Sequence, residues 1–190
     1  MMRRCCKSGY ACLLLLFLGA CAPISQDLGN TTDVSACAGE VIQPPVGLVE
    51  VMDTELRQAA EGEPGKGKLC KAKIFLVQMP VSVYRIWDSA WPDRARGNWW
   101  TLNYPAGSRD SYRQAEAICP EWSGLDRLIV CTVKVGTRVA IGPGQSADCA
   151  NGLSYAPSAE NQVYIPNDSR NQQIFVENCS SGAPWPDADP

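Results

Sequence analysis

Hydrophobic and polar residues alternate along several short runs of the chain, and this two-residue period predicts half-buried β-strands. In residues 81–87, "VSVYRIW", Arg85 falls on the same face as Val81 and Val83. Other strand-like runs lie at 71–78, 128–135, 137–142, 161–166 and 172–179. The pattern therefore predicts a domain in which strands dominate.

Two segments have helical rather than strand-like spacing. Residues 53–63 predict a short helix capped by Asp53 or Thr54, and residues 108–122 predict a second helix that Pro120 stops. A few helices among many strands indicate an α+β domain built on an antiparallel or mixed sheet. A chain of 190 residues favours one such domain.

The chain begins with basic residues and a short apolar run, "ACLLLLFLGA", which is too short to cross a bilayer. Residues 1–20 are typical of a signal peptide. The run ends in "LGAC", which resembles the bacterial lipoprotein signal and implies cleavage before Cys21 and its acylation, for example with palmitate. Ala22 follows, and the absence of Asp there implies the outer membrane, facing the periplasm or the cell surface. A plain secretory signal cut nearby is the alternative.

Composition divides the remainder of the chain. Residues 21–49 are rich in Ser, Thr, Gly and Pro, which predicts a lipid-anchored tether. Residues 50–180 carry the periodic runs and form the expected domain. Residues 181–190 contain three prolines and no period, so they predict a loose tail.

Cysteine usage fits an exported protein. Of ten cysteines, three lie in the signal peptide and Cys21 would carry lipid. The six that remain are Cys37, Cys70, Cys119, Cys131, Cys149 and Cys179. An even number in an exported chain predicts three disulfides, with fifteen possible pairings. The sequence has no CxxC pair and no histidine, so it predicts no metal site.

Charge and the missing histidine exclude several functions. The net charge of −3 and the absence of a dense basic run argue against nucleic acid as a partner. Without histidine, the Ser-His-Asp and Cys-His nucleophile systems are excluded. Arginine, amide, hydroxyl and aromatic side chains remain, and these can bind a phosphate-bearing ligand.

Three stretches of the sequence carry candidate chemistry. Arg85 in an apolar strand needs either a carboxylate partner or a bound anion. Trp99 and Trp100 should point to opposite faces, so that one fills the core and the other lines a cleft, although both could be core residues. Gln162 opens a strand on the face of Tyr164, where an ordinary polar edge is the simpler interpretation.

Five motifs occur in a fixed order over roughly residues 70–166. They are "VYRIWD" (83–88), "GNWWT" (97–101), "AICPEW" (117–122), "VKVGTRVAIG" (133–142) and "NQVYIP" (161–166). In this order they resemble the ADP-ribosyltransferase-like domains of bacterial polymorphic toxins and the related necrotizing-toxin-type NAD glycohydrolases. The resemblance implies the ADP-ribosyltransferase fold, with NAD as substrate and no further cofactor.

The last strand departs from the transferase pattern. Such transferases usually carry Glu-x-Glu there, whereas this chain has Glu160-Asn161-Gln162. An amide can orient a ribose but is a poor base, so the resemblance implies hydrolysis of NAD to ADP-ribose and nicotinamide more than ADP-ribosyl transfer. Arg85, on phosphate, and Gln162, on ribose, would be the catalytic pair. The resemblance implies four further substrate-binding residues: Trp99, Trp100, Thr101 and Glu160.

A non-catalytic function is the alternative. An outer-membrane lipoprotein with a toxin-like fold could bind an envelope partner or neutralise an incoming toxin. The state of the cleft distinguishes the two hypotheses. An enzyme should leave Arg85 and Gln162 facing one open pocket with no internal acidic partner for Arg85, whereas a binding module could fill that pocket with its own side chains.

Overall fold

The computed structural model describes residues 37–185. The predicted signal peptide, Cys21, most of the predicted tether and the last five residues lie outside the described part. The helices are α1 (Thr54–Ala60) and α2 (Arg109–Glu116), with single 3-10 turns η1 (Pro92–Arg94) and η2 (Pro120–Trp122). The strands are β1 (Leu48–Val51), β2 (Lys73–Val77), β3 (Val81–Trp87), β4 (Trp99–Thr101), β5 (Arg127–Val133), β6 (Arg138–Pro143), β7 (Ala147–Asp148), β8 (Ser154–Tyr155), β9 (Asn161–Tyr164), β10 (Val176–Glu177) and β11 (Ala183–Pro184).

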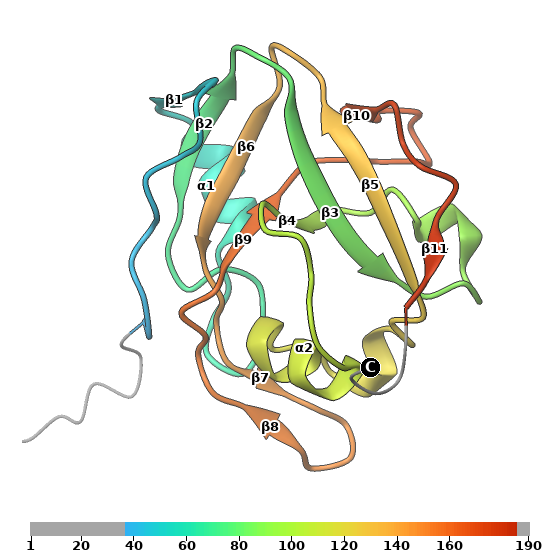
Figure 1. Ribbon diagram of the computed structural model, residues 1–190. Helices are drawn as coiled ribbons and strands as arrows, with labels where there is room; N and C mark the ends of the chain where they lie inside the picture. The colour runs from blue at the N-terminus through green and yellow to red at the C-terminus, as the bar shows by residue number, and fades with distance from the viewer. Residues whose placement is uncertain (1–36, 186–190) are drawn as a thin grey trace, which may run out of the picture. The chain divides into compact units, whose positions relative to one another are not determined.

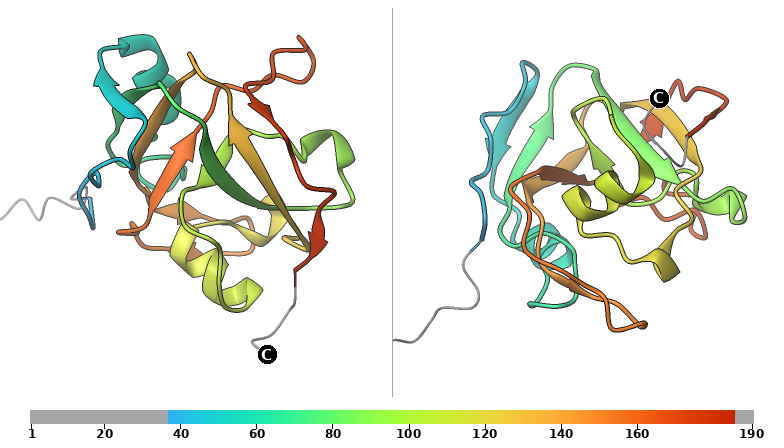
Figure 2. Two further views of the ribbon diagram at one scale, coloured as in Figure 1. Left: turned by 45° about the horizontal axis from the view of Figure 1, so that its top comes forward. Right: turned by 60° about the horizontal axis from the view of Figure 1, so that its bottom comes forward.

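Nine strands form one sheet in the order β1-β2-β6-β9-β4-β3-β5-β10, with β11 also paired to β5 (Figure 1). Every pair of strands in it is antiparallel. β7 and β8 form a separate hairpin, which lies beside α2 in Figures 1 and 2. The described residues thus confirm the predicted α+β class with an antiparallel sheet.

Alternation along the central strands divides them between two hydrophobic layers. Trp100 and Val163 belong to the largest core cluster, whereas Trp99 and Tyr164 pack against a smaller cluster on the side of α1. The same division separates Ile141 from its neighbour Ala140. The two-residue period of a strand is the reason, since successive side chains point to opposite faces.

Each helix begins at a side-chain cap. Asp53 accepts a hydrogen bond from the Leu56 N–H at the start of α1, as the sequence predicts, and Ser108 accepts one from the Ser111 N–H at the start of α2. α2 ends three residues earlier than predicted, because Ala117 adopts a left-handed conformation with φ 51°. This C-terminal turn directs the chain into η2 rather than continuing the helix to Pro120.

The six cysteines form three disulfides, which confirms that prediction. The pairs, which the sequence did not choose, are Cys37–Cys70, Cys119–Cys149 and Cys131–Cys179. Cys119–Cys149 joins the end of the α2 region to the loop before β8. Cys131–Cys179 joins β5 to the segment after β10.

The C-terminal segment differs from the loose tail that the sequence predicts. Ala183 pairs with Leu128 of β5, and Trp185 is buried beside Leu128 and Leu125. Burial of the indole explains why this proline-containing stretch is held against the sheet. No helix in the range 37–185 is long and apolar enough to span a membrane.

Candidate functional site

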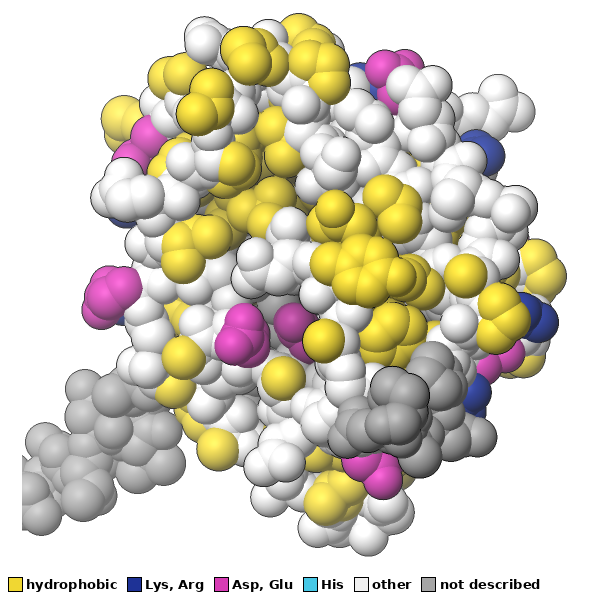
Figure 3. Space-filling model, in the orientation of Figure 1, with side chains coloured by type: hydrophobic (Ala, Val, Ile, Leu, Met, Phe, Trp, Pro, Cys, Tyr) yellow, Lys and Arg dark blue, Asp and Glu magenta, His cyan; other side chains and the backbone are white. Residues whose placement is uncertain are grey.

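A cavity of about 160 Å³ lies between the sheet and α2. Its wall combines residues from β3, β4 and β9 with residues from α2 and the segment after it. Arg85, Trp99, Trp100 and Gln162, four of the predicted site residues, all line it. We call it the central cavity. In Figure 3 acidic side chains lie next to a hydrophobic patch on the face that carries α2.

Arg85 reaches the central cavity because β3 and β4 share only one residue pair, Tyr84 with Thr101. Beyond that pair the Arg85 Nη1 donates to the Trp99 main-chain oxygen at 2.6 Å. The Nε of Arg85 is buried and has no hydrogen-bond partner, and none of the ion pairs found within residues 37–185 includes Arg85. Burial lowers the pKa of Arg85 to about 10, so the guanidinium remains charged at neutral pH.

A glycine makes this position of the guanidinium possible. A Cβ added at Gly97 would lie 2.7 Å from the Arg85 Nη2. Any side chain at residue 97 would therefore displace the guanidinium from its place beside Trp99. The "GNWWT" motif thus supplies both a close approach, through Gly97, and an acceptor for Arg85, through the Trp99 carbonyl.

Gln162 faces α2 from the middle of the sheet. It pairs with Thr101 of β4 on one side and with Gly142 of β6 on the other. Its side chain is 8% exposed, and its Nε2 donates to the main-chain oxygen of Glu116 at 2.9 Å. This hydrogen bond satisfies one carbonyl at the end of α2 and fixes the orientation of the amide.

The two titratable residues that α2 contributes to the cavity wall were missed by sequence reasoning. Burial, and to a lesser extent the nearby charge of Glu160, raises the pKa of Glu116 to about 8. Burial also raises the pKa of Tyr112 above its ordinary value. Helical spacing alone would have grouped Tyr112 and Glu116, four residues apart, on one face of α2.

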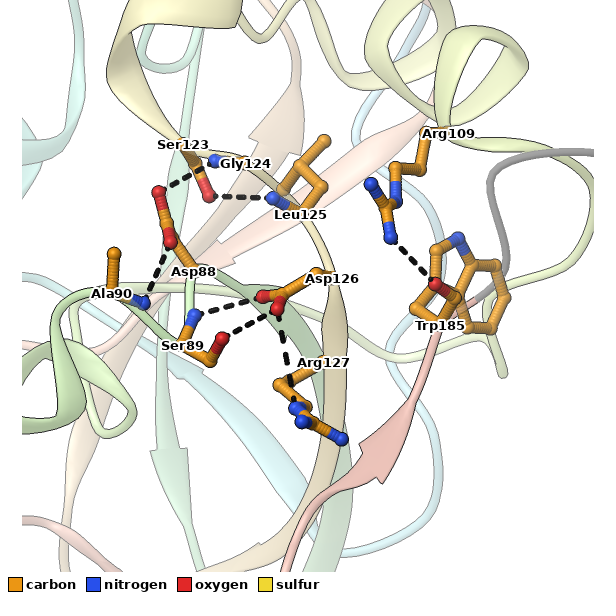
Figure 4. Close-up of polar contacts among 10 residues, drawn as sticks. All are labelled: Asp88, Ser89, Ala90, Arg109, Ser123, Gly124, Leu125, Asp126, Arg127 and Trp185. Atoms are coloured by element: carbon orange, nitrogen blue, oxygen red, sulfur yellow. Dashed lines mark hydrogen bonds and ion pairs between the residues drawn. The ribbon is translucent and has the colours of Figure 1, made fainter.

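A polar network holds one wall of the cavity (Figure 4). The carboxylate of Asp88 accepts from the Gly124 N–H at 2.8 Å, and that of Asp126 accepts from the Ser89 N–H at 2.8 Å. These bonds join the end of β3 to the segment that leads into β5. Leu125, which lines the cavity, is held there with a φ of 53°. The network therefore fixes a strained backbone next to the site.

The predicted substrate-binding residues are not all in the wall. Trp99 and Trp100 line the cavity, although Trp100 is 2% exposed and belongs mainly to the core. Thr101 is buried opposite Gln162, and its Oγ1 accepts from the Asn103 N–H, outside the lining. Glu160 is exposed, and its effect on the cavity is electrostatic, because its negative charge raises the pKa of Glu116.

One group of potential metal ligands occurs among the described residues. It consists of Cys119, Glu121 and Cys149. The two cysteines are bonded to each other, so neither sulfur is a thiolate that could bind a metal.

No family model and no curated protein matches the chain. A solved structure described as "Structure of Tne2 in complex with Tni2" is similar to 66% of this chain and 98% of the matched chain, with 11% sequence identity and a TM-score of 0.44. A similarity this distant carries no argument for function.

Proposed function

We propose that the protein is an NAD-using enzyme that hydrolyses NAD to ADP-ribose and nicotinamide. One observation carries the proposal: the half-buried, charged Arg85 lines the same cavity as Gln162 and Trp99, and no acidic residue within 37–185 pairs with it. A partly desolvated guanidinium in this state is suited to a phosphate-bearing ligand. The resemblance of the five sequence motifs adds NAD as the specific ligand.

The chemistry requires little of the protein. Nicotinamide leaves as a neutral molecule, so the departing group needs no general acid. The C1′–N bond breaks, the ribose passes through an oxocarbenium-like state, and water adds to C1′ and loses a proton. Gln162 would orient the ribose, and Arg85 would hold the diphosphate.

Glu116 adds a group that the Glu-x-Gln sequence of the last strand lacks. Its carboxyl belongs to the same cavity wall, and its main chain is bonded to Gln162. In its charged form it would stabilise the cationic ribose and accept the proton from the attacking water. We therefore include Glu116 with Arg85 and Gln162 in the proposed active site.

Two observations favour the non-catalytic alternative, a binding module with a toxin-like fold. The Gln162 amide already donates to a main-chain oxygen, and the cavity is smaller than the roughly 300–1,000 Å³ of a typical ligand site. In such a module, the polar groups of the cavity would be structural. An unidentified protein partner would then bind elsewhere on the surface.

A direct assay separates the two functions. The exported protein, purified with its disulfides intact, is mixed with NAD, and free nicotinamide and ADP-ribose are measured by chromatography. Turnover that is lost in Gln162→Ala and kept in Arg138→Ala, an exposed arginine paired with Asp53, supports hydrolysis. A complete absence of nicotinamide release contradicts it and leaves the binding module.

The location of the enzyme is part of the same proposal. We propose an exported protein held at the outer membrane through a lipid on Cys21, on the strength of the "LGAC" signal. Two acyl chains are enough for stable anchoring on a bilayer. The three disulfides are compatible with an oxidising compartment.

A further inference from the structure

A second, larger cavity of about 730 Å³ adjoins the proposed active site. The loop between β3 and β4 and the segment after β9 form its wall, and Arg85 and Trp99 line both cavities. We call it the arginine cavity. The central cavity is too small for a whole dinucleotide. Because Arg85 belongs to both walls, ligands in the two cavities can contact the same guanidinium.

Arginine side chains outnumber carboxylates in the lining of the arginine cavity. Besides Arg85, its lining includes three arginines, Arg94, Arg96 and Arg170, and two aspartates, Asp93 and Asp168. The Asp168 carboxylate already accepts from the backbone N–H groups of Arg170 and Asn171 and from the Asn171 side chain. Arg96, like Arg85, has no acidic partner within residues 37–185.

The wall beneath these arginines is held in place by amide side chains. Asn98 Nδ2 donates to the main-chain oxygens of Ile165 and Asn167, at 3.0 and 2.8 Å. Asn167 is 7% exposed and its Nδ2 donates to the Gly97 oxygen at 2.9 Å. The loop between β3 and β4 is therefore fastened to the segment after β9 at Gly97 and Asn98, which makes the site preorganised.

Arg85 connects this wall to the active site. Its Nη1 is bonded to the Trp99 oxygen, its Nη2 lies close to Gly97, and its Nε is buried without a partner. Because Arg85 lines both cavities, a phosphate oxygen in either one can accept a hydrogen bond from the part of the guanidinium that faces it.

We propose that the arginine cavity binds the diphosphate and nucleoside end of the substrate, with Arg96 and Arg85 on the phosphates. The ligand class is a nucleoside diphosphate such as ADP. The inference depends on the proposed function only for the identity of the whole substrate, because ADP binding is measured without any reaction.

The test is calorimetric titration of the full exported protein with ADP, in parallel with inorganic pyrophosphate. We expect one ADP per chain, weaker binding at higher salt, and an affinity lowered about tenfold or more in Arg96→Ala. Gly97→Ala should lower it as well, because the added methyl displaces the Arg85 guanidinium. Arg138→Ala, at an exposed arginine that is paired with Asp53 and does not line the arginine cavity, should bind ADP as the wild type does.

The outcomes separate the inference from the proposed function. Failure of ADP to bind, or equal binding in the wild type and Arg96→Ala, overturns the inference even if NAD is hydrolysed. Pyrophosphate binding as tightly as ADP overturns the nucleoside part of the assignment. Arg96-dependent ADP binding in a protein that releases no nicotinamide supports the inference and contradicts the proposed function alone.

Discussion

At the scale of single residues, the properties of the site depend on two ionisable side chains that are largely withdrawn from water. Arg85 is a charged side chain placed between strands without a carboxylate, and Glu116 is a carboxyl whose burial raises its pKa to about 8. Each arrangement costs folding free energy that a purely structural residue would avoid. Perturbed groups that share a cavity make it a candidate functional site.

Substitutions at Arg85 and Gln162 should affect different steps. Arg85→Ala should weaken NAD binding by roughly 10- to 100-fold, since a charge-assisted contact is lost. Gln162→Ala should lower kcat more than it raises KM, because ribose orientation matters most in the transition state. Gln162→Glu should keep or raise activity by supplying a carboxylate near the cation. Steady-state kinetics measure this, and equal effects of both alanine variants on KM alone would contradict the assigned roles.

Glu116→Gln should change the pH dependence of stability. The raised pKa in the folded protein means that the contribution of Glu116 to stability is fully present below the ordinary pKa of 4.5 and is lost as the pH rises through about 8. The neutral variant lacks this loss, so it should become more stable than the wild type by about 1–3 kcal/mol at pH 8.5, with little difference at pH 4.5.

Urea unfolding at pH 4.5, 6.5 and 8.5 measures this difference. Glu177→Gln, at an exposed position on β10, is the matched control. The groups that face Glu116 are Tyr112 on its own helix, Glu160 before β9, and the other charged residues of the cavity wall, Arg85 and Lys68. A stability difference that does not grow with pH would show that the Glu116 carboxyl is not buried as described.

At the scale of elements, α2 contributes Tyr112 and Glu116 to the cavity wall although it is only eight residues long. A helix this short is marginal by itself and depends on its caps and its packing. Ser108 holds its first turn, and Gln162 bonds the carbonyl of its last residue. The position of Tyr112 and Glu116 therefore depends on interactions at both ends of α2.

Ser108→Ala should destabilise the protein by about 0.5–2 kcal/mol, because the Ser111 N–H loses its acceptor. Ser108→Asp keeps an acceptor at the cap and should retain most of the stability. Thermal or urea unfolding of the two variants measures this. Equal loss in both variants would show that the hydroxyl is not acting as a cap.

At the scale of the whole molecule, three disulfides close loops of 33, 30 and 48 residues around a sheet with a modest core. Each pair joins parts of the chain that lie far apart in sequence. In the chain-entropy account, loops of this length make each bridge worth about 2–4 kcal/mol.

The oxidised domain should contain no free thiol among its six cysteines. Alkylation without reduction, followed by mass spectrometry, should leave all six unmodified. Replacing Cys119 and Cys149 together by alanine should lower stability by about 2–4 kcal/mol and also reduce activity, because that bridge lies next to the active-site helix. Two or more alkylated cysteines in the untreated protein would contradict three bridges.

Cys21→Ser should abolish lipid labelling and release the protein from the membrane, since the acceptor thiol is removed. Metabolic labelling with a palmitate analogue and fractionation measure this. Cys21 lies outside the described residues, so the prediction depends on the "LGAC" signal alone. Unchanged lipid labelling in the variant would contradict the lipoprotein hypothesis.

The sequence by itself determined what local chemistry controls. A two-residue period places Trp99 and Trp100 on opposite faces, because a strand has no other geometry. A cap-forming residue just before a helical run predicts Asp53 or Thr54 as the cap of α1, and Asp53 is the one observed. Six cysteines in an exported chain predict three bridges, because all six thiols can pair in an oxidising compartment.

Only the tertiary structure decided which distant residues meet. The hydrogen bond between Gln162 and Glu116 spans 46 residues of the sequence. It exists because β9 lies between β6 and β4 in the sheet and the Gln162 side chain faces the end of α2. Strand order and disulfide pairing are global solutions to burying one core, and no local pattern encodes them. For the same reason the sequence could suggest that Arg85 needs an anion, but only the fold could place its guanidinium between two cavities.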